Sequence, residues 1–484
     1  MRHKVVLKVL GVLLTLFSAT HLPPAAVALW FGETGVLVTF LASGALTLAT
    51  GIVCWLPVRR FHRELKFRDG FLVVVLFWTG LASFGALPFY LSDQVDAGLT
   101  DAFFESMSGL TTTGASVLTG LDELPRSLLY YRQQLQWLGG MGIIVLAVAV
   151  MPMLGVGGMQ LFRAETPGPV KNTKLTPRIT QTAKAMWLIY TGLTTACALG
   201  YLAAGMSLFD AIGHSFSTVA IGGFSTHDAS LGHYDSPAVA AVATVFMLLA
   251  ALNFALHFLA FRSRNPMLYL RDPEARAFFL FVGIVCAIAV ATLLCYGTYA
   301  ETDDALWRGV FHVVSIGTTT GFTSGGFHWW PTFLPVMLIM MSAVGGCATS
   351  TAGGMKVIRV VLLYKQGRRE IQHLIHPQAV VPVKLGARPV PDPVINAVWG
   401  FSALYILSYV VASLAMTATG ADLVTAFSAV TACLNNLGPG LGEVTDNYAS
   451  ISAAGKWLLA FTMLLGRLEL FTLLVLFTRS YWVS

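Results

Sequence analysis

Charged residues are scarce in this chain. Asp, Glu, Lys and Arg make up 11% of its 484 residues, about half the share of an average soluble protein, whereas 56% are hydrophobic. A soluble globule of this size could not cover itself with so little polar surface. The composition therefore excludes a secreted domain, a disordered chain and an ordinary cytosolic enzyme, and it predicts an all-α, polytopic membrane protein.

Cysteine is also scarce, and its spacing indicates no metal site. The six cysteines are Cys54, Cys197, Cys286, Cys295, Cys347 and Cys433. They lie far apart and form neither a C-x-x-C pair nor a Cys/His cluster of the zinc-binding kind. We expect them to be small core residues, with no disulfide framework. The chain also lacks the G-x-x-x-x-G-K-[ST] motif of a primary pump.

Apolar windows long enough to cross a bilayer occur at about ten places. They fall near 5–22, 35–56, 70–91, 130–152, 184–205, 237–261, 277–298, 333–363, 394–418 and 456–478. The first follows Arg2, His3 and Lys4 and resembles a signal peptide, but we expect it to remain as the first span. Ten spans predict a multi-pass protein embedded in a lipid bilayer.

The few charged residues are distributed unevenly between the two sides of these spans. Clusters of Lys and Arg occupy every second loop, at 59–68, 163–184, 262–276 and 365–388, whereas the alternate loops carry mainly Asp and Glu. The positive-inside rule places the basic loops and both termini in the cytoplasm. The acidic outer face would attract cations, although translocated loops that simply lack positive charge explain the pattern equally well.

Four outer loops share one layout. Each has a short amphipathic stretch, too short to span a membrane, followed by a turn rich in glycine or threonine. When the turns are aligned on Gly114, Gly223, Gly321 and Gly438, the repeats lie 109, 98 and 117 residues apart. We expect four units of helix, re-entrant pore helix and helix around a central pore, preceded by two extra N-terminal helices.

The predicted division of the chain follows from these repeats. The two N-terminal helices take 1–68, and the four repeats take 69–162, 163–264, 265–376 and 377–484. An extended segment that returns from the middle of a membrane survives only where it lines a wet cavity. Four such segments could stack rings of backbone carbonyls that replace the hydration shell of a monovalent cation. The alternative is that these small residues merely allow close helix packing.

Several motifs carry a resemblance to a known family. Besides the four turns, the chain has QWLGGMG at 136–142, LGVGGMQ at 154–160 and GRLE at 466–469. With these it resembles the superfamily of Trk, Ktr and HKT potassium transporters, most closely the bacterial TrkH/TrkG-type subunits. The resemblance implies K⁺ uptake across the bacterial inner membrane, K⁺ as the transported ion and no organic cofactor on this chain. It also implies a homodimer with a cytoplasmic, nucleotide-binding ring of the TrkA type, and no nucleic-acid partner.

The resemblance also assigns a selectivity filter. Its ion-lining backbone would be Thr111, Thr112, Thr113, Gly114, Ala220, Ile221, Gly222, Gly223, Thr318, Thr319, Thr320, Gly321, Asn435, Asn436, Leu437 and Gly438. Glycine at the first aligned position, Gly114, implies selectivity for K⁺, because serine there accompanies sodium transport in the HKT branch.

A gate is predicted below this filter. The window 333–363 is unusually long and is interrupted by a stretch rich in Gly, Ser and Thr, which exposes backbone that must line a cavity. The expected gate residues are Gly345, Gly346, Thr349, Ser350, Thr351, Gly353, Gly354, Lys356 and Arg467. A charged residue such as Arg467 inside a span is a functional hypothesis by default. The alternatives are a kink sealed by neighbouring helices and a buried Arg467–Glu469 pair that stabilises the bundle.

Two rival functions stay open at this point. One is a carrier that couples K⁺ to H⁺ or Na⁺. The other is an intramembrane serine hydrolase that uses Ser116 or Ser225 with His214, although neither serine stands in a G-x-S-x-G setting. We expect His214, His257 and His312 to be packing residues, and we expect no enzyme activity.

Overall fold

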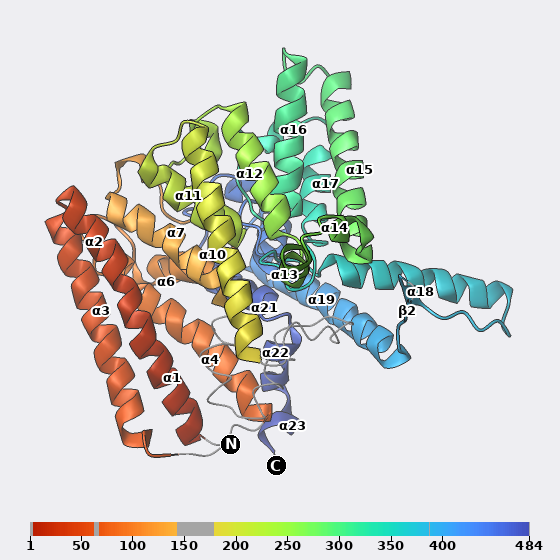
Figure 1. Ribbon diagram of the computed structural model, residues 1–484. Helices are drawn as coiled ribbons and strands as arrows, with labels where there is room; N and C mark the ends of the chain where they lie inside the picture. Colours follow the sequence, from red (N-terminus) through yellow and green to blue (C-terminus); the bar gives the residue numbers. More distant parts are fainter. Residues whose placement is uncertain (1–2, 62–66, 143–178, 387, 484) are drawn as a thin grey trace.

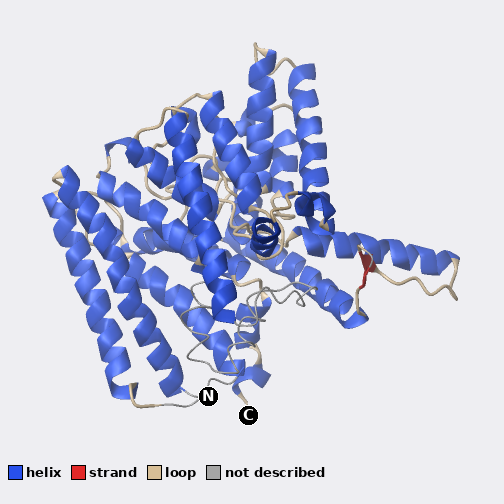
Figure 2. Ribbon diagram, in the orientation of Figure 1, coloured by secondary structure: helices blue, strands red, loops and turns tan. Residues whose placement is uncertain are grey.

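The protein is a bundle of helices. A computed structural model describes residues 3–61, 67–142, 179–386 and 388–483, and within them the only sheet is the short antiparallel pair of β1 and β2 (Figures 1 and 2). The longer helices are α1 (His3–Ser18), α2 (Leu22–Phe31), α3 (Thr34–Trp55), α4 (Phe67–Gly85), α6 (Leu99–Leu110), α7 (Arg126–Gly140), α10 (Ile179–Ala203), α11 (Leu208–Ala220), α12 (Pro237–Ala250), α13 (Phe254–Ser263), α15 (Pro273–Cys295), α16 (Thr302–Gly317), α17 (Leu334–Met341), α18 (Val357–Ile375), α19 (Asp392–Ala418), α20 (Leu423–Leu434) and α21 (Ala453–Arg467). The shorter elements are α5 (Leu87–Tyr90), α14 (Met267–Arg271), α22 (Phe471–Leu474), α23 (Arg479–Trp482), β1 (Lys384–Leu385) and β2 (Arg388–Pro389).

The long apolar helices of the structure confirm the prediction of a multi-pass, all-α membrane protein. Among the described residues, six helical stretches are long and apolar enough to span a bilayer, and the number rises to eight if each of two bent pairs counts as one span. The six are His3–Phe31, Thr34–Val58, Arg68–Tyr90, Lys184–Ala203, Pro273–Cys295 and Asp392–Ala418. The predicted window 333–363 is divided between α17 and α18, as its glycine-rich interruption indicates. The window 130–152 begins in α7, and its part beyond residue 142 lies outside the described residues.

Two predicted spans are not continuous helices. The window 237–261 bends by 94° between α12 and α13, and the window 456–478 bends by 111° after α21. Neither break contains proline or glycine, and the local sign of the first is Asn253, which caps the start of α13 by accepting the amide of Ala255 at 2.8 Å. Tertiary contacts stabilise the first break, because the amide of Cys347 donates to the carbonyl of Ala251 at 2.8 Å. The second break is a turn with positive φ at Glu469 and Leu470.

The N-terminal helices form a hairpin at one edge of the bundle (Figure 1). The helices α1 and α3 touch through two glycines: a Cβ built on Gly11 would lie 2.8 Å from the carbonyl of Gly51, and one on Gly51 would lie 2.7 Å from the amide of Thr15. Only glycine allows the two backbones to approach so closely. The first apolar window therefore forms helices that pack on the rest of the chain, as expected of a span.

The apolar core has two main parts, and α20 contributes side chains to both. One joins side chains of α1, α4, α6 and α7 with those of α19 to α21, and the other joins α10 to α12 with α15 to α17. The short helices α6, α11, α16 and α20 contribute to these two parts and bury most of their residues. Their C-terminal ends position the site described next.

The α1–α3 contact predicts the effect of a methyl group at Gly51. Alanine normally stabilises a helix interior by up to about 1 kcal/mol relative to glycine. At Gly51 we expect Gly51→Ala instead to destabilise the protein by about 1–3 kcal/mol, because the new Cβ would overlap backbone of α1. Thermal unfolding in detergent should show a lower midpoint. The matched control is Gly192→Ala, on an exposed helix position where a Cβ meets nothing within 4 Å. Equal midpoints for the two variants would contradict the close contact.

Candidate ion-binding site

Four short helices, here called the ring helices, end in the same unusual backbone conformation. They are α6, α11, α16 and α20. Near the end of each, the residue two positions before the aligned glycine has positive φ: 53° at Thr112, 55° at Ile221, 68° at Thr319 and 53° at Asn436. The glycines themselves have φ of 82° at Gly114, 80° at Gly223, 85° at Gly321 and 97° at Gly438. The structure thus gives the four predicted filter stretches, here called the ring segments (111–114, 220–223, 318–321 and 435–438), one shared geometry.

The ring segments form a closed ring in chain order. A Cβ on Gly114 would lie 2.1 Å from the carbonyl oxygen of Gly222, in the second segment. The same contact joins the second segment to the third, the third to the fourth and the fourth back to the first: Gly223 to Thr320 at 2.1 Å, Gly321 to Leu437 at 2.1 Å and Gly438 to Thr113 at 2.7 Å. Glycine is therefore required at these positions for two reasons, its positive φ and the neighbouring carbonyl.

Most carbonyl oxygens of the ring segments lack a hydrogen-bond donor. Among the described residues, only those of Gly222, Asn435 and Gly438 receive one, from Gln136, the Gly354 amide and the Tyr448 hydroxyl. The ring segments are nevertheless mostly buried. Buried carbonyls without a partner are rare unless water or an ion satisfies them. The remaining carbonyls are therefore available to a cation.

The ring helices add electrostatic support for a cation. Their C-terminal ends, which carry the partial negative charge of the helix dipole, lead directly into the ring segments. Their N-terminal turns contain acidic residues in three cases, and the fourth is capped by Asp422. Hydrogen bonds from the Thr425 side chain and from the backbone amides of Thr425 and Val424 hold the pKa of Asp422 below its usual value. The carboxylates therefore balance the positive ends of the helices.

A side chain nine residues before the aligned glycine braces three of the loops that follow the ring. On α6, Glu105 accepts the amide of Val117 at 3.0 Å. On α11, His214 Nε2 lies 2.9 Å from Ser225 Oγ, and on α16, His312 Nε2 lies 3.1 Å from the carbonyl of Gly325. In the fourth ring helix the contact comes from the position ten residues before the aligned glycine. There the Ser428 hydroxyl donates to the carbonyl of Leu441 and accepts its amide. Each ring segment is thus held from both ends.

Sequence reasoning missed the buried ion pair behind the ring. Arg132 of α7 pairs with Glu105 at 2.8 Å, and both side chains are almost fully inaccessible to solvent. Arg132 also donates to the carbonyl of Ser225 at 2.9 Å and to Ser116 Oγ at 3.0 Å, which joins the first loop to the second. Gln136, one turn further along α7, accepts the amide of Phe224 at 3.0 Å. The sequence signal for this pair was the polar composition of α7, because an apolar window there contains Arg132 and three glutamines.

A cavity of about 300 Å³ opens on one side of the ring, and we call it the vestibule. Its lining includes all four aligned glycines, so it reaches the ring itself. Arg132 of α7 also lines it, and the remaining lining residues belong to the loops after the ring segments and include Asp228 and Asp446. The vestibule thus gives water and ions access to the ring from this side.

On the other side of the ring lies the loop between α17 and α18 (342–356), here called the intramembrane loop. The amide of Gly353 donates to Thr319 Oγ1 at 2.7 Å, and that of Gly354 donates to the Asn435 carbonyl at 3.2 Å. Thr351 Oγ1 donates to the carbonyl of Val219 at 3.0 Å. The intramembrane loop therefore contacts the ends of three ring helices, α11, α16 and α20.

The intramembrane loop is folded tightly on itself. Gly345 and Gly354 have positive φ, and a Cβ on Gly345 would lie 2.1 Å from the carbonyl of Gly353. Lys356 donates from Nζ to the carbonyls of Ser350 and Ala352. The loop is also anchored to neighbouring segments. The amide of Ala348 donates to the Glu274 carboxylate at 2.7 Å, and the Thr349 hydroxyl donates to the Asn253 side chain at 2.6 Å. Gly346 packs on the Ala251 carbonyl. The predicted gate residues of this loop are thus assembled in one place.

Arg467 links the intramembrane loop to α7. Its guanidinium donates to the carbonyl of Thr351 at 3.2 Å and to that of Gly139, near the end of α7, at 2.7 Å. The alternative ion pair with Glu469 is not formed. Glu469 pairs instead with Arg359 of α18, because the turn after α21 directs it away. The Arg467–Glu469 pair, which the sequence left open as the alternative to a gate, is therefore not the arrangement in this structure.

The structure brings together residues of the hydrolase hypothesis, but not in the geometry of a hydrolase. Ser225 and His214 are hydrogen-bonded, yet the other ring nitrogen of His214 lies 2.9 Å from the backbone carbonyl of Asp210 and forms no hydrogen bond with a carboxylate of the described residues. His312 of α16 has the same arrangement without a serine hydroxyl as its partner. The pair is thus one of several braces. His257 likewise bonds Tyr269 and a backbone carbonyl, as expected of a packing residue.

Comparison with known proteins supports a transporter. The model of the family described as TrkH, cation transport protein, matches residues 37–482. The chain is 54% identical to the Trk system potassium uptake protein TrkH of Vibrio parahaemolyticus and 52% identical to that of Escherichia coli strain K12, with all of each chain covered. It is 38% identical to the Trk system potassium uptake protein TrkG of the same strain, over 99% of both chains. The crystal structure of the potassium transporter TrkH from Vibrio parahaemolyticus is similar over all of both chains, with a TM-score of 0.91 and 52% identity. These names describe transport, which confirms the expectation of a transporter and not an enzyme.

The buried pair predicts a strong effect of removing one charge. We expect Arg132→Met to destabilise the protein by about 3–5 kcal/mol, because it leaves Glu105 buried without its partner. The double variant Glu105→Gln with Arg132→Met should unfold at a higher temperature than Arg132→Met alone, since no buried charge is left. The control is the pair of half-buried Arg369 and exposed Asp392, where Arg369→Met should cost about 0–1 kcal/mol. A double variant as unstable as the single one would contradict this account.

Proposed function

Because the chain belongs to the TrkH family of cation transport proteins, we propose that it takes up potassium ions through the ring of four backbone segments. The observation that carries this proposal is the closed ring of buried carbonyls that mostly lack protein donors. A monovalent cation that loses its water needs several oxygen ligands at once, and a carbonyl ring supplies them. The transported ion, K⁺, is the substrate, and no organic cofactor takes part.

The proposed filter is the backbone of the ring segments at 111–114, 220–223, 318–321 and 435–438. The alternation of positive φ at the second and fourth residues of each segment supports it, because it is found four times with the same spacing. Each aligned glycine leaves room for a carbonyl of the next segment, so the spacing of the ring is fixed by contact. We propose that the four units around the ring correspond to the predicted repeats at 69–162, 163–264, 265–376 and 377–484.

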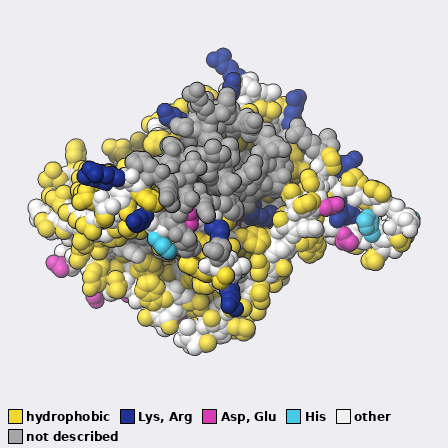
Figure 3. Space-filling view, turned by 90° about the horizontal axis from the view of Figure 1, so that it is seen from below, with side chains coloured by type: hydrophobic (Ala, Val, Ile, Leu, Met, Phe, Trp, Pro, Cys, Tyr) yellow, Lys and Arg dark blue, Asp and Glu magenta, His cyan; other side chains and the backbone are white. Residues whose placement is uncertain are grey.

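We propose that the vestibule faces the outside of the bacterial inner membrane and that both termini are cytoplasmic. The loops around the vestibule carry Asp122, Asp228 and Asp446, which raise the local concentration of cations. Both ends of the described chain lie at the lower end of the bundle in Figure 1. Lys and Arg side chains lie around this lower face in Figure 3, which agrees with the positive-inside rule.

The gate in this proposal is the intramembrane loop together with Arg467. The loop contacts the second, third and fourth units and Arg467 reaches the first unit at Gly139, so the path below the ring is closed on all sides. Arg467 and Lys356 are both buried there and repel K⁺. Opening therefore requires the loop to move away from the ring and Arg467 to release the carbonyl of Thr351.

The assembly in this proposal is a homodimer that carries a cytoplasmic, TrkA-type nucleotide-binding ring. The helix α18 supports it, because it extends away from the other helices (Figure 1). It exposes Tyr364, Ile371, Leu374 and Ile375 beside Lys365 and Arg368. Such an apolar face on a helix with basic residues suits a protein partner better than open water. The relatives' names also refer to a Trk system, which indicates more than one component.

The filter proposal predicts the effect of a side chain at Gly114. In proteoliposomes with an imposed potential, we expect Gly114→Ser to reduce the preference for K⁺ over Na⁺ by about tenfold or more, a loss of about 1.4 kcal/mol of discrimination. Its Cβ would overlap the Gly222 carbonyl and displace it. The matched control is Gly120→Ser, because Gly120 also has positive φ but has nothing within 4 Å of its Cβ position. If Gly114→Ser remains as selective as the control, the assignment of the filter is wrong.

The gate proposal predicts that Arg467→Ala raises the K⁺ flux measured without the regulatory ring. Removal of the cation and of its two carbonyl contacts should loosen the intramembrane loop. Arg467→Lys should have a smaller effect, since it keeps the charge, and Arg479→Ala at an exposed position should have none. An unchanged basal flux in folded Arg467→Ala would refute the gate. A flux that follows an imposed H⁺ or Na⁺ gradient in the same assay would favour coupled transport.

A further inference from the structure

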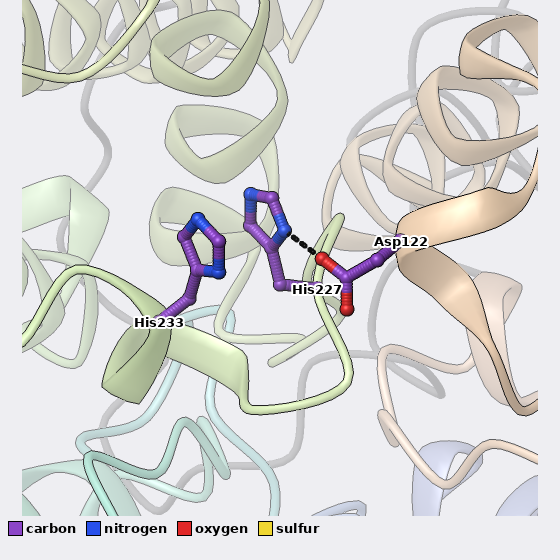
Figure 4. A group of neighbouring side chains, drawn as sticks. All are labelled: Asp122, His227 and His233. Carbon is purple, nitrogen blue, oxygen red and sulfur yellow. Dashed lines mark hydrogen bonds and ion pairs between the residues drawn. The ribbon is translucent and has the colours of Figure 1, made fainter.

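Three polar side chains meet at the rim of the vestibule, outside the ring. Asp122 comes from the loop after the first ring segment, and His227 and His233 come from the loop after the second. Figure 4 shows His227 between the other two, with its ring nitrogen directed at the Asp122 carboxylate. One ligand atom from each residue lies within 4.8 Å of the ligand atoms of the others. We call these residues the rim cluster.

We propose that the rim cluster binds a divalent transition-metal ion, with Zn²⁺ as the representative. Two imidazoles and one carboxylate are the ligands that zinc takes in open sites, where water occupies the fourth position. The same set binds Cu²⁺ or Ni²⁺, whereas Mg²⁺ and Ca²⁺ prefer oxygen ligands alone. In a tetrahedral site with bonds of about 2.0–2.1 Å, the ligand atoms lie about 3.3 Å apart. Rotation of the side chains is enough to bring the ligand atoms from within 4.8 Å of one another to this separation.

The geometry allows this rotation. The rings of His227 and His233 are stacked in parallel, with centroids 3.5 Å apart and 1° between their planes. In that arrangement their nitrogen lone pairs do not converge, so one ring must turn to share a metal. His233 is exposed, and its ring forms no hydrogen bond with any described residue. Asp122 is about half exposed, so neither side chain is confined by packing.

The charge around the rim cluster also favours a cation. His227 Nδ1 faces Asp122, which leaves Nε2 as the lone-pair nitrogen when the ring is neutral. This Nε2 is buried, has no hydrogen-bond partner among the described residues and lies 3.8 Å from the Asp210 carboxylate. Asp210 thus places a second carboxylate close to the rim cluster, and its negative charge favours a cation there. The amide of Leu121 donates to Asp228 at 2.8 Å, which fixes the two loops together beside the cluster.

A metal ion at the rim would oppose potassium entry, and this consequence depends on the proposed function. His227 and Asp228 line the vestibule together with the four aligned glycines. Two positive charges there would repel K⁺ before it reaches the ring. The rim cluster would thus act as an inhibitory site for zinc on the vestibule side.

Zinc binding to the purified full-length protein tests the site without any transport. We expect one Zn²⁺ per chain in a dye-competition titration, with affinity lowered about tenfold or more in His233→Gln and in Asp122→Asn. His233→Gln keeps the hydrogen bond between His227 and Asp122, so it should fold normally, and its elution profile in gel filtration checks this. The matched control is His328→Gln, at an exposed histidine of the loop after the third ring segment. Equal affinity in all these proteins, or no binding, would overturn the proposal.

A flux assay then tests the consequence. Zn²⁺ added to proteoliposomes should slow K⁺ uptake by wild type and by His328→Gln, with each rate compared to its own zinc-free value, and EDTA should reverse the effect. Uptake by His233→Gln should resist the same zinc concentration. A protein that transports K⁺ but does not bind zinc would refute the rim cluster alone. A protein that binds zinc at the rim but carries no K⁺ would refute the proposed function alone.

Discussion

The contact between each aligned glycine and a carbonyl of the next segment is the constraint on which the rest of the structure depends. It links the four ring segments into a closed ring, although they lie about a hundred residues apart in the chain. Any side chain at these positions would separate neighbouring segments and open the ring. The positive φ of the same residues is a second reason for glycine, so conformation and packing impose the same choice.

Unpaired carbonyls buried together in a ring cost free energy, and the polar network around the ring keeps them in place. Arg132 and Glu105 form a fully buried ion pair whose remaining donors reach two different loops. His214 and His312 brace the loops of the second and third repeats in one pattern. These bonds lie behind the ring and not in it. They satisfy the polar groups of the loops while leaving the ring oxygens open to an ion.

The sequence was sufficient for the features that depend on local chemistry. Glycine spacing predicted which residues share the ring, and the interruption of one long window predicted the intramembrane loop. It was insufficient for features that depend on contacts between distant segments. The breaks after Ala250 and Arg467 contain no helix-breaking residue and are formed by tertiary contacts and local backbone turns. The pairing of Glu469 with Arg359, 110 residues away, and the meeting of Asp122 with His227 could not be predicted from spacing alone.

The central claim is that the ring binds a dehydrated monovalent cation, and the position of such an ion tests it most directly. Crystals of the protein grown with Rb⁺ or Tl⁺ in place of K⁺ would reveal bound ions by anomalous scattering. The account predicts peaks on the axis of the ring, level with the carbonyls of the four segments and between Gly114, Gly223, Gly321 and Gly438. Ions bound only in the vestibule, with none inside the ring, would contradict it.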